Sequence, residues 1–203
     1  MVKIFLKLPL FVVFLTTSSI LKADPYSLAN ISQYLQNLKI LKADFSQTNP
    51  DGTISSGTIL IKRPGRMRFE YNKPDKTLVL VSAGALAIFD PKGDEKPITY
   101  PIKNNPISLI LKGEVDLLNS GIVAKYKVSA EKAVLTIRDP KKPQRGSVEL
   151  VFVGTKPELE KFSIKNENGS STSISLKDIE YPKKLNETLF SIALETSKRR
   201  RKD

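Results

Sequence analysis

The 203-residue sequence predicts a mainly β (α+β) fold of about ten or eleven strands. These strands would form a large, strongly curved antiparallel sheet or an incompletely closed barrel, with two or three helices on its concave side. The first observation behind this prediction is a succession of short, turn-linked segments in which apolar and polar side chains alternate. The second is an apolar segment, residues 105–113, which has no polar face and must therefore be covered.

Residues 1–23 predict a secretory signal peptide. They combine a basic start, a short apolar run and a polar end that offers Ala23 to a peptidase. An uncleaved anchor is the alternative, because Leu21 is not the small residue preferred at such cleavage sites. The chain has no Cys, which excludes lipid attachment and disulfides. We expect residues 24–203 to form a single domain that is stabilised by burial alone.

The chain is strongly basic, with a formal charge of +12. Much of that charge lies in a C-terminal tail at residues 198–203, which is either a solvated end or a contact for an anionic membrane surface. The charge is not accompanied by a recognition helix, zinc finger or RNA-binding aromatic motif, so nucleic acid is not an expected partner.

The first element of the predicted domain is an amphipathic helix over residues 25–38. Pro25 suits its first turn, and Leu28, Ile31 and Leu35 follow at helical spacing while Ser, Asn and Gln occupy the other face. Packing of the apolar face against a core explains most of this pattern.

The period then changes to two, and a meander of antiparallel strands is predicted. The expected strands are residues 41–47, 53–62, 66–71, 76–82 and 86–90. In the third of these, Met67, Phe69 and Tyr71 share one face and charged residues take the other. That large apolar face is either an ordinary core or a surface that receives something.

The middle of the chain interrupts the sheet. An Asn-Pro pair at residues 105–106 predicts the start of a helix that Gly113 can end, and residues 116–121 add a short apolar turn. Strands then resume at residues 123–129, 133–138, 147–153, 159–165 and 171–181, with a last short one near residues 191–194.

The composition argues against an enzyme. The absence of His and Cys excludes Ser-His-Asp and Cys-His nucleophilic sites and the usual zinc ligand sets. No phosphate-cradling glycine loop occurs, and no cofactor is expected. Asp90, Asp94, Asp116 and Asp139 all lie in turn-like contexts, although spacing alone leaves a glycosidase-like pair open.

Five segments together resemble the periplasmic outer-membrane lipoprotein carrier family, LolA. They are, in chain order, "ADFSQ", "GTILIKRPGRMRFEY", "LVSAGALAIFD", "NPISLIL" and "LFSIAL". The resemblance implies an unclosed β-barrel with a helical lid over a hydrophobic cavity. It also implies a periplasmic monomer that takes lipoproteins from an ABC-type release complex in the inner membrane. Such carriers deliver them to the outer membrane, in many bacteria through a receptor, LolB.

The resemblance also implies which residues form the site. Arg63 matches the family arginine that helps to hold the lid shut; the alternative is a surface arginine at a turn. Met67 lies where the family often has Phe, a position implicated in contact with the release complex and in the cavity entrance. Ala83 and Ala87 depart from the family pattern, which often has Asp and an aromatic residue there. The residues expected to line the cavity are Leu28, Ile31, Leu35, Phe45, Met67, Phe69, Ile107, Ile110, Leu111 and Leu117.

Physical chemistry is consistent with a carrier of acyl chains. Leaving some tens of methylenes in water costs about 0.8 kcal/mol each, so long acyl chains need a cover during transit. Two alternatives remain at this point. One is a regulatory domain that senses a lipid on the same half-barrel, and the other is a carrier of another lipid.

Overall fold

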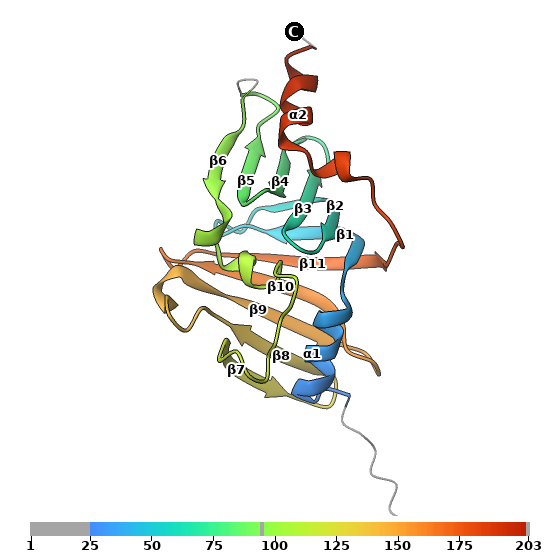
Figure 1. The fold of residues 1–203 in the computed structure, drawn as a ribbon, viewed down its shortest axis with the longest axis vertical. Helices are drawn as coiled ribbons and strands as arrows, with labels where there is room; N and C mark the ends of the chain where they lie inside the picture. Colours follow the sequence, from blue (N-terminus) through green and yellow to red (C-terminus); the bar gives the residue numbers. More distant parts are fainter. Residues whose placement is uncertain (1–24, 94–95, 202–203) are drawn as a thin grey trace, which may run out of the picture.

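The computed structural model describes residues 25–93 and 96–201, and it has the predicted mainly β architecture (Figure 1). The predicted signal peptide lies outside these residues. The described strands form one antiparallel sheet of eleven. They are β1 (Ile40–Thr48), β2 (Ile54–Lys62), β3 (Arg66–Tyr71), β4 (Leu78–Ser82), β5 (Ala85–Phe89), β6 (Ile98–Pro101), β7 (Val123–Val128), β8 (Lys132–Ile137), β9 (Gly146–Val153), β10 (Glu158–Asn166) and β11 (Ser171–Glu180). Among the described residues, no helix has the length and apolar character needed to span a bilayer.

The strand order explains why the sheet stays open. It runs β6-β5-β4-β3-β2-β1-β11-β10-β9-β8-β7, so β1 and β11 pair near the middle and β6 and β7 are the two edges. These edge strands are consecutive in the chain. Residues 102–122, which join them, therefore run from one edge of the sheet to the other, and their buried side chains belong to the main core cluster. The connection acts as a cover because of the topology itself.

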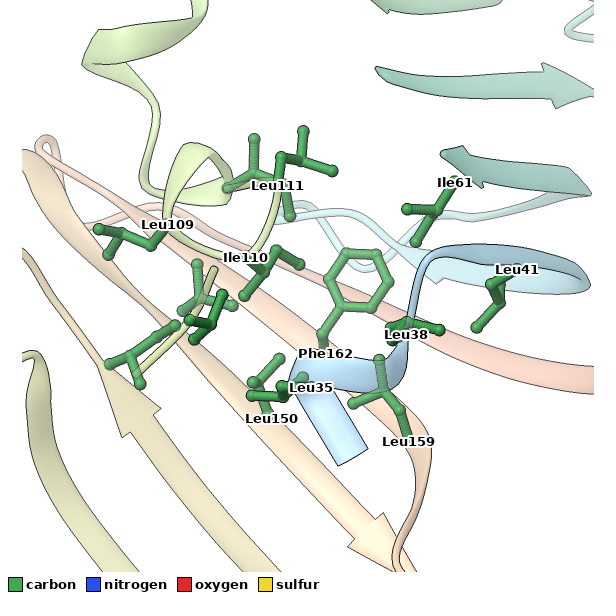
Figure 2. Packing of buried hydrophobic residues seen from close by; sticks show 14 of the residues in the cluster. Leu35, Leu38, Leu41, Ile61, Leu109, Ile110, Leu111, Leu150, Leu159 and Phe162 are labelled. Carbon is green, nitrogen blue, oxygen red and sulfur yellow. The ribbon is translucent and has the colours of Figure 1, made fainter. Parts of the chain in front are cut away.

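The concave face of the sheet is apolar because strand alternation places one set of side chains there. In β2 and β3, Ile59 pairs with Phe69 and Ile61 with Met67, and all four are buried. The same parity continues through β1 and across β8 to β11. Figure 2 shows how α1 and the connection bring Leu35, Leu38 and Ile110 against Phe162 and Leu150 of the sheet.

The N-terminal helix α1 spans Leu28–Asn37, three residues shorter at its start than the pattern predicts. Ser27 caps it, because the Ser27 side chain accepts a hydrogen bond from the Asn30 amide, and Pro25 precedes the helix instead of lying in its first turn. Ile31 and Leu35 are buried, as the helical spacing indicates. Leu38 is extended and leads directly into β1.

The helix predicted at residues 105–113 is wrong beyond its first turn. Asn105 caps the start as expected, but the helix is a single 3₁₀ turn, η2 (Pro106–Leu109), preceded by another, η1 (Ile102–Asn104). The carbonyl of Leu111 accepts from the amide of Gly65 at 2.8 Å, and that of Lys112 accepts from Arg63. These two carbonyls, which would lack a partner at the end of a helix, instead hold the segment on the sheet.

The strand predicted near residues 191–194 is also wrong. A 3₁₀ turn, η4 (Glu187–Phe190), leads into helix α2 (Ile192–Arg199), which Ser191 caps. Ile192 packs against a second cluster on the convex face, made of Leu78, Leu80, Ala87 and Phe89. The Arg199 guanidinium lies 4.9 Å from the centroid of the Phe89 ring. The C-terminal segment thus covers the outside of β4 and β5 (Figure 1), and the predicted basic tail begins inside α2.

Candidate functional site

The structure brings all ten predicted cavity residues together on the concave side. They belong to, or pack against, a single apolar cluster formed by α1, the connection 102–122 and the sheet. All except Leu28, which is half-buried, are buried in this closed arrangement. The side chains contributed by α1 and by the connection fill the concave face, so a ligand could reach it only if these covering elements moved.

Three aromatic side chains form one end of this surface. Phe45 makes edge contacts with Phe69 and Tyr71, with ring centroids 5.2 Å and 5.1 Å apart, and Phe69 and Tyr71 stack at 6.3 Å. The Tyr71 hydroxyl donates to Gln47 at 2.7 Å. Burial raises the pKa of Tyr71 to about 12, so its phenol stays neutral and the surface carries no charge there.

Arg63 is the buried cation of the site, with 6% of its surface exposed. Its Nη1 donates to the carbonyls of Leu35 and Leu38, the latter at 3.1 Å. Its Nε donates to the Lys112 carbonyl at 2.7 Å, and Nη2 reaches the Gly113 carbonyl at 3.5 Å. One side chain from the end of β2 therefore holds both covering elements through their backbones.

The electrostatics of Arg63 follow from these partners. Burial lowers the pKa of its guanidinium, which nevertheless remains protonated because the ordinary value is so high. Within the described part of the chain, no carboxylate forms an ion pair with it. The negative end of the α1 dipole and the backbone carbonyls compensate the charge instead.

A second contact joins the two covering elements to each other. Ser32 of α1 is 3% exposed, and its hydroxyl accepts a hydrogen bond from the Leu117 amide at 3.4 Å. Nearby, the Tyr26 hydroxyl donates to the Glu131 carbonyl at 2.7 Å and so ties the start of α1 to the β7–β8 turn. Helix α1 is thus held at both of its ends.

The apolar surface extends beyond the covered region at the open edges, which the sequence did not reveal. In β6, Ile98 pairs with Ile88 and Tyr100 with Leu86, so both lie on the concave face, yet they are 58% and 53% exposed. Val128 of β7 is exposed at the opposite edge. In the sequence, only the alternation of apolar and polar residues in the four-residue β6, "ITYP", could have indicated this exposed apolar edge. Pro101 weakens the indication of a strand there.

The two departures noted in the sequence lie away from the apolar concave surface. Ala83 adopts φ 49° as the first residue of the two-residue turn between β4 and β5. Ala87 is fully buried in the convex cluster beneath α2. A larger residue at 87 would therefore meet the C-terminal segment and would not reshape the concave face.

Comparison with known proteins identifies what this architecture is similar to. The sequence model of a family described as "Outer membrane lipoprotein carrier protein LolA" matches residues 36–193. The chain is 26% identical over 183 residues to the outer-membrane lipoprotein carrier protein of Coxiella burnetii, covering 85% of each chain. It is 31% identical over 160 residues to that of Dechloromonas aromatica, covering 74% of this chain and 75% of the relative.

Two solved structures with similar folds are a putative outer membrane lipoprotein-sorting protein domain from Vibrio parahaemolyticus and a LolA superfamily protein from Nitrosomonas europaea. The first has a TM-score of 0.48 and 10% identity, covering 83% of this chain and 96% of the other. The second has a TM-score of 0.42 and 11% identity, covering 80% and 96%.

Proposed function

The chain belongs to the LolA family of outer-membrane lipoprotein carrier proteins, and from that membership we propose that it carries lipoproteins by taking their acyl chains onto its concave apolar face. The family consists of carriers and not of enzymes. The observation that supports the mechanism most is Arg63, a single buried side chain whose hydrogen bonds all go to the backbone of the two covering elements.

The energetics suit a carrier that must bind and also release. An acyl chain in water gains about 0.8 kcal/mol for each methylene that it buries. In the empty protein, α1 and the connection already bury Ile31, Leu35, Ile107 and Leu111 against the sheet. Loading has to expose these side chains, which offsets part of the gain from the lipid. Net affinity is therefore lower than the buried area of the acyl chains suggests, and transfer to an acceptor stays feasible.

The cover opens when the hydrogen bonds of Arg63 to α1 and to the connection break. When α1 and residues 112–113 move away, Arg63 exchanges their carbonyls for water or for polar groups of the cargo. The exposed apolar side chains of β6, Ile98 and Tyr100, lie at the edge where the concave face continues into solvent. We place the entrance for the acyl chains at this edge and not at Met67, which is 1% exposed, because part of the apolar surface is accessible here before the cover moves.

The proposed partners follow from the family. The carrier would receive triacylated lipoproteins from an ABC-type release complex in the inner membrane and pass them to an outer-membrane receptor, where the cell has one. It would work in the periplasm as a monomer, after export by the N-terminal segment.

Native mass spectrometry of the protein purified from its own periplasm tests the proposal. We expect a fraction of molecules to carry the mass of a triacylated lipoprotein. That fraction should rise in the Arg63→Leu variant, because a weaker closed state competes less with the lipid and hand-over is impaired. A free glycolipid in its place would favour a carrier of another lipid. An empty protein bound to a membrane signalling partner would favour the sensor.

A further inference from the structure

A cavity lies at the C-terminal end of α1; we call it the outer cavity, because buried side chains separate it from the concave face. Its volume is about 600 Å³, within the range of small-molecule sites. It is bounded by the C-terminal turn of α1, the start of β1, the β9–β10 turn and the segment that follows β11. Its apolar walls are the side chains of Tyr34, Leu38, Ile40, Pro157, Tyr181 and Pro182.

The floor of this cavity separates it from the concave face. Leu38 and Leu159 are buried in the main cluster, and Tyr34 packs edge-on against Phe152, with ring centroids 5.6 Å apart at 81°. A molecule in the outer cavity would rest on these side chains without displacing α1. The outer cavity is therefore available in the closed protein, in contrast to the concave face.

A chain of hydrogen bonds fixes the two tyrosines in the wall. The Leu159 amide donates to the Tyr34 oxygen at 3.3 Å, the Tyr34 and Tyr181 hydroxyls are 3.2 Å apart, and the Tyr181 hydroxyl donates to Glu158 at 2.9 Å. Because the Tyr181 hydrogen is used on Glu158, Tyr34 is the donor between the two hydroxyls. Burial raises the pKa of both phenols above their ordinary value, so the wall stays neutral and in place.

The rim of the cavity is positively charged. Lys39, Lys156 and Lys183 line it and are exposed, and Glu158, which Tyr181 engages, is the acidic residue beside them. Within residues 25–93 and 96–201, none of the three ammonium groups takes part in an ion pair. Three free cations around an apolar hollow are complementary to an anionic head group on an apolar chain.

We propose that this outer cavity is a binding site for an amphiphile with one apolar chain and an anionic head group, either a carboxylate or a phosphate. The chain lies between the two tyrosine rings and the two prolines, and the head group meets Lys156 and Lys183 at the rim. This site is separate from the acyl-chain surface of the proposed function and does not depend on it.

Nuclear magnetic resonance of protein with ¹³C-labelled tyrosine rings tests this proposal. Signals are assigned with Tyr34→Phe and Tyr181→Phe, and the protein is titrated with dodecanoate, dodecyl phosphate or dodecanol below micellar concentrations. We expect both anions to shift the Tyr34 and Tyr181 signals saturably, and dodecanol to bind about tenfold more weakly because it lacks the charge. Tyr71 reports separately on the concave face.

Charge reversal at the rim provides the decisive comparison. Lys156→Glu with Lys183→Glu should weaken the response of Tyr34 and Tyr181 to the anions at least about tenfold. The matched control reverses Lys125 and Lys165, which are also exposed but lie on the convex face, and should leave the response unchanged. The proposal would be overturned if dodecanol and dodecanoate bound equally well, or if the two double variants had equal effects. It would also be overturned if the Tyr34 and Tyr181 signals did not shift.

Discussion

Replacing Arg63 with leucine should loosen both covering elements without unfolding the sheet. The variant loses hydrogen bonds to the carbonyls of Leu35, Leu38 and Lys112 and a longer one to Gly113. Each bond to a charged group contributes about 1.5 to 3 kcal/mol net. Returning a buried cation to water offsets several kcal/mol of that sum. We therefore expect the closed arrangement to lose on the order of 3 kcal/mol, which is about a hundredfold in its equilibrium with the open one.

Amide hydrogen exchange resolved by segment is the assay for this prediction. Exchange of α1 and of residues 106–117 should accelerate by about that hundredfold factor, while the amides of β1, β2 and β11 keep their protection. In Arg63→Lys, exchange of α1 should be faster than in the unaltered protein and slower than in Arg63→Leu, because lysine retains the charge but not the planar set of donors. Arg138→Leu, at an exposed arginine at the end of β8, serves as the control and should change nothing. Unchanged exchange of α1 in Arg63→Leu would refute the reasoning that this side chain holds the cover.

Three further substitutions test other parts of the structure. Met67 is 1% exposed, so Met67→Glu must bury a carboxylate at a cost of several kcal/mol, and it should reduce both the melting temperature and lipoprotein loading. The control Met67→Leu should cost less than about 1.5 kcal/mol of stability. Normal loading by the Glu variant would assign Met67 to packing alone. Ala83 has φ 49°, so Ala83→Asn should raise the free energy of unfolding in urea by about 1 kcal/mol, and a lower value would contradict the turn geometry. A hydrogen bond from Lys62 and the charge of Arg66 hold the pKa of Glu187 below its ordinary 4.5. The ionised Glu187 side chain therefore stabilises the folded protein above that pH, and this stabilisation is lost as the pH falls through the lower pKa of the folded state. Glu187→Gln should therefore reduce hydrogen-exchange protection of α2 at neutral pH but not in acid, and a pH-independent difference would exclude this ion pair as the cause.

The strands and the concave apolar face could be predicted because their signal is local. Side chains in a strand alternate with period two, so the pattern of Phe45, Met67 and Phe69 fixes which of them share a face once the strands pair. The β1–β11 pairing and the opening between β6 and β7 are not contained in any local window. The number of short strands predicts a curved sheet or an incompletely closed barrel, and the family resemblance favours the second of these.

The covering segment and the C-terminus show where local patterns fail. Residues 105–113 are apolar on nearly all sides, and that pattern does not distinguish a helix from a loop whose carbonyls bond elsewhere. The decisive partner, Arg63, is 49 residues from Lys112 in sequence. Residues 191–194 are too short an apolar segment for periodicity to distinguish a strand from a helix. Ser191 as a cap and the basic last turn were the available helix signals.

The most direct test of the central claim is to locate the acyl chains on the protein. A photoreactive benzoylphenylalanine is placed at Phe69 on the concave face or, as the matched control, at Leu60, which alternation places on the opposite face of the neighbouring strand. Each variant is loaded with a triacylated lipoprotein and irradiated, and the cross-linked fragments are identified by mass spectrometry. We predict acyl adducts from position 69 and none from position 60. Adducts from position 60 alone, or equal yields from both, would contradict the assignment of the concave face as the lipid-carrying surface.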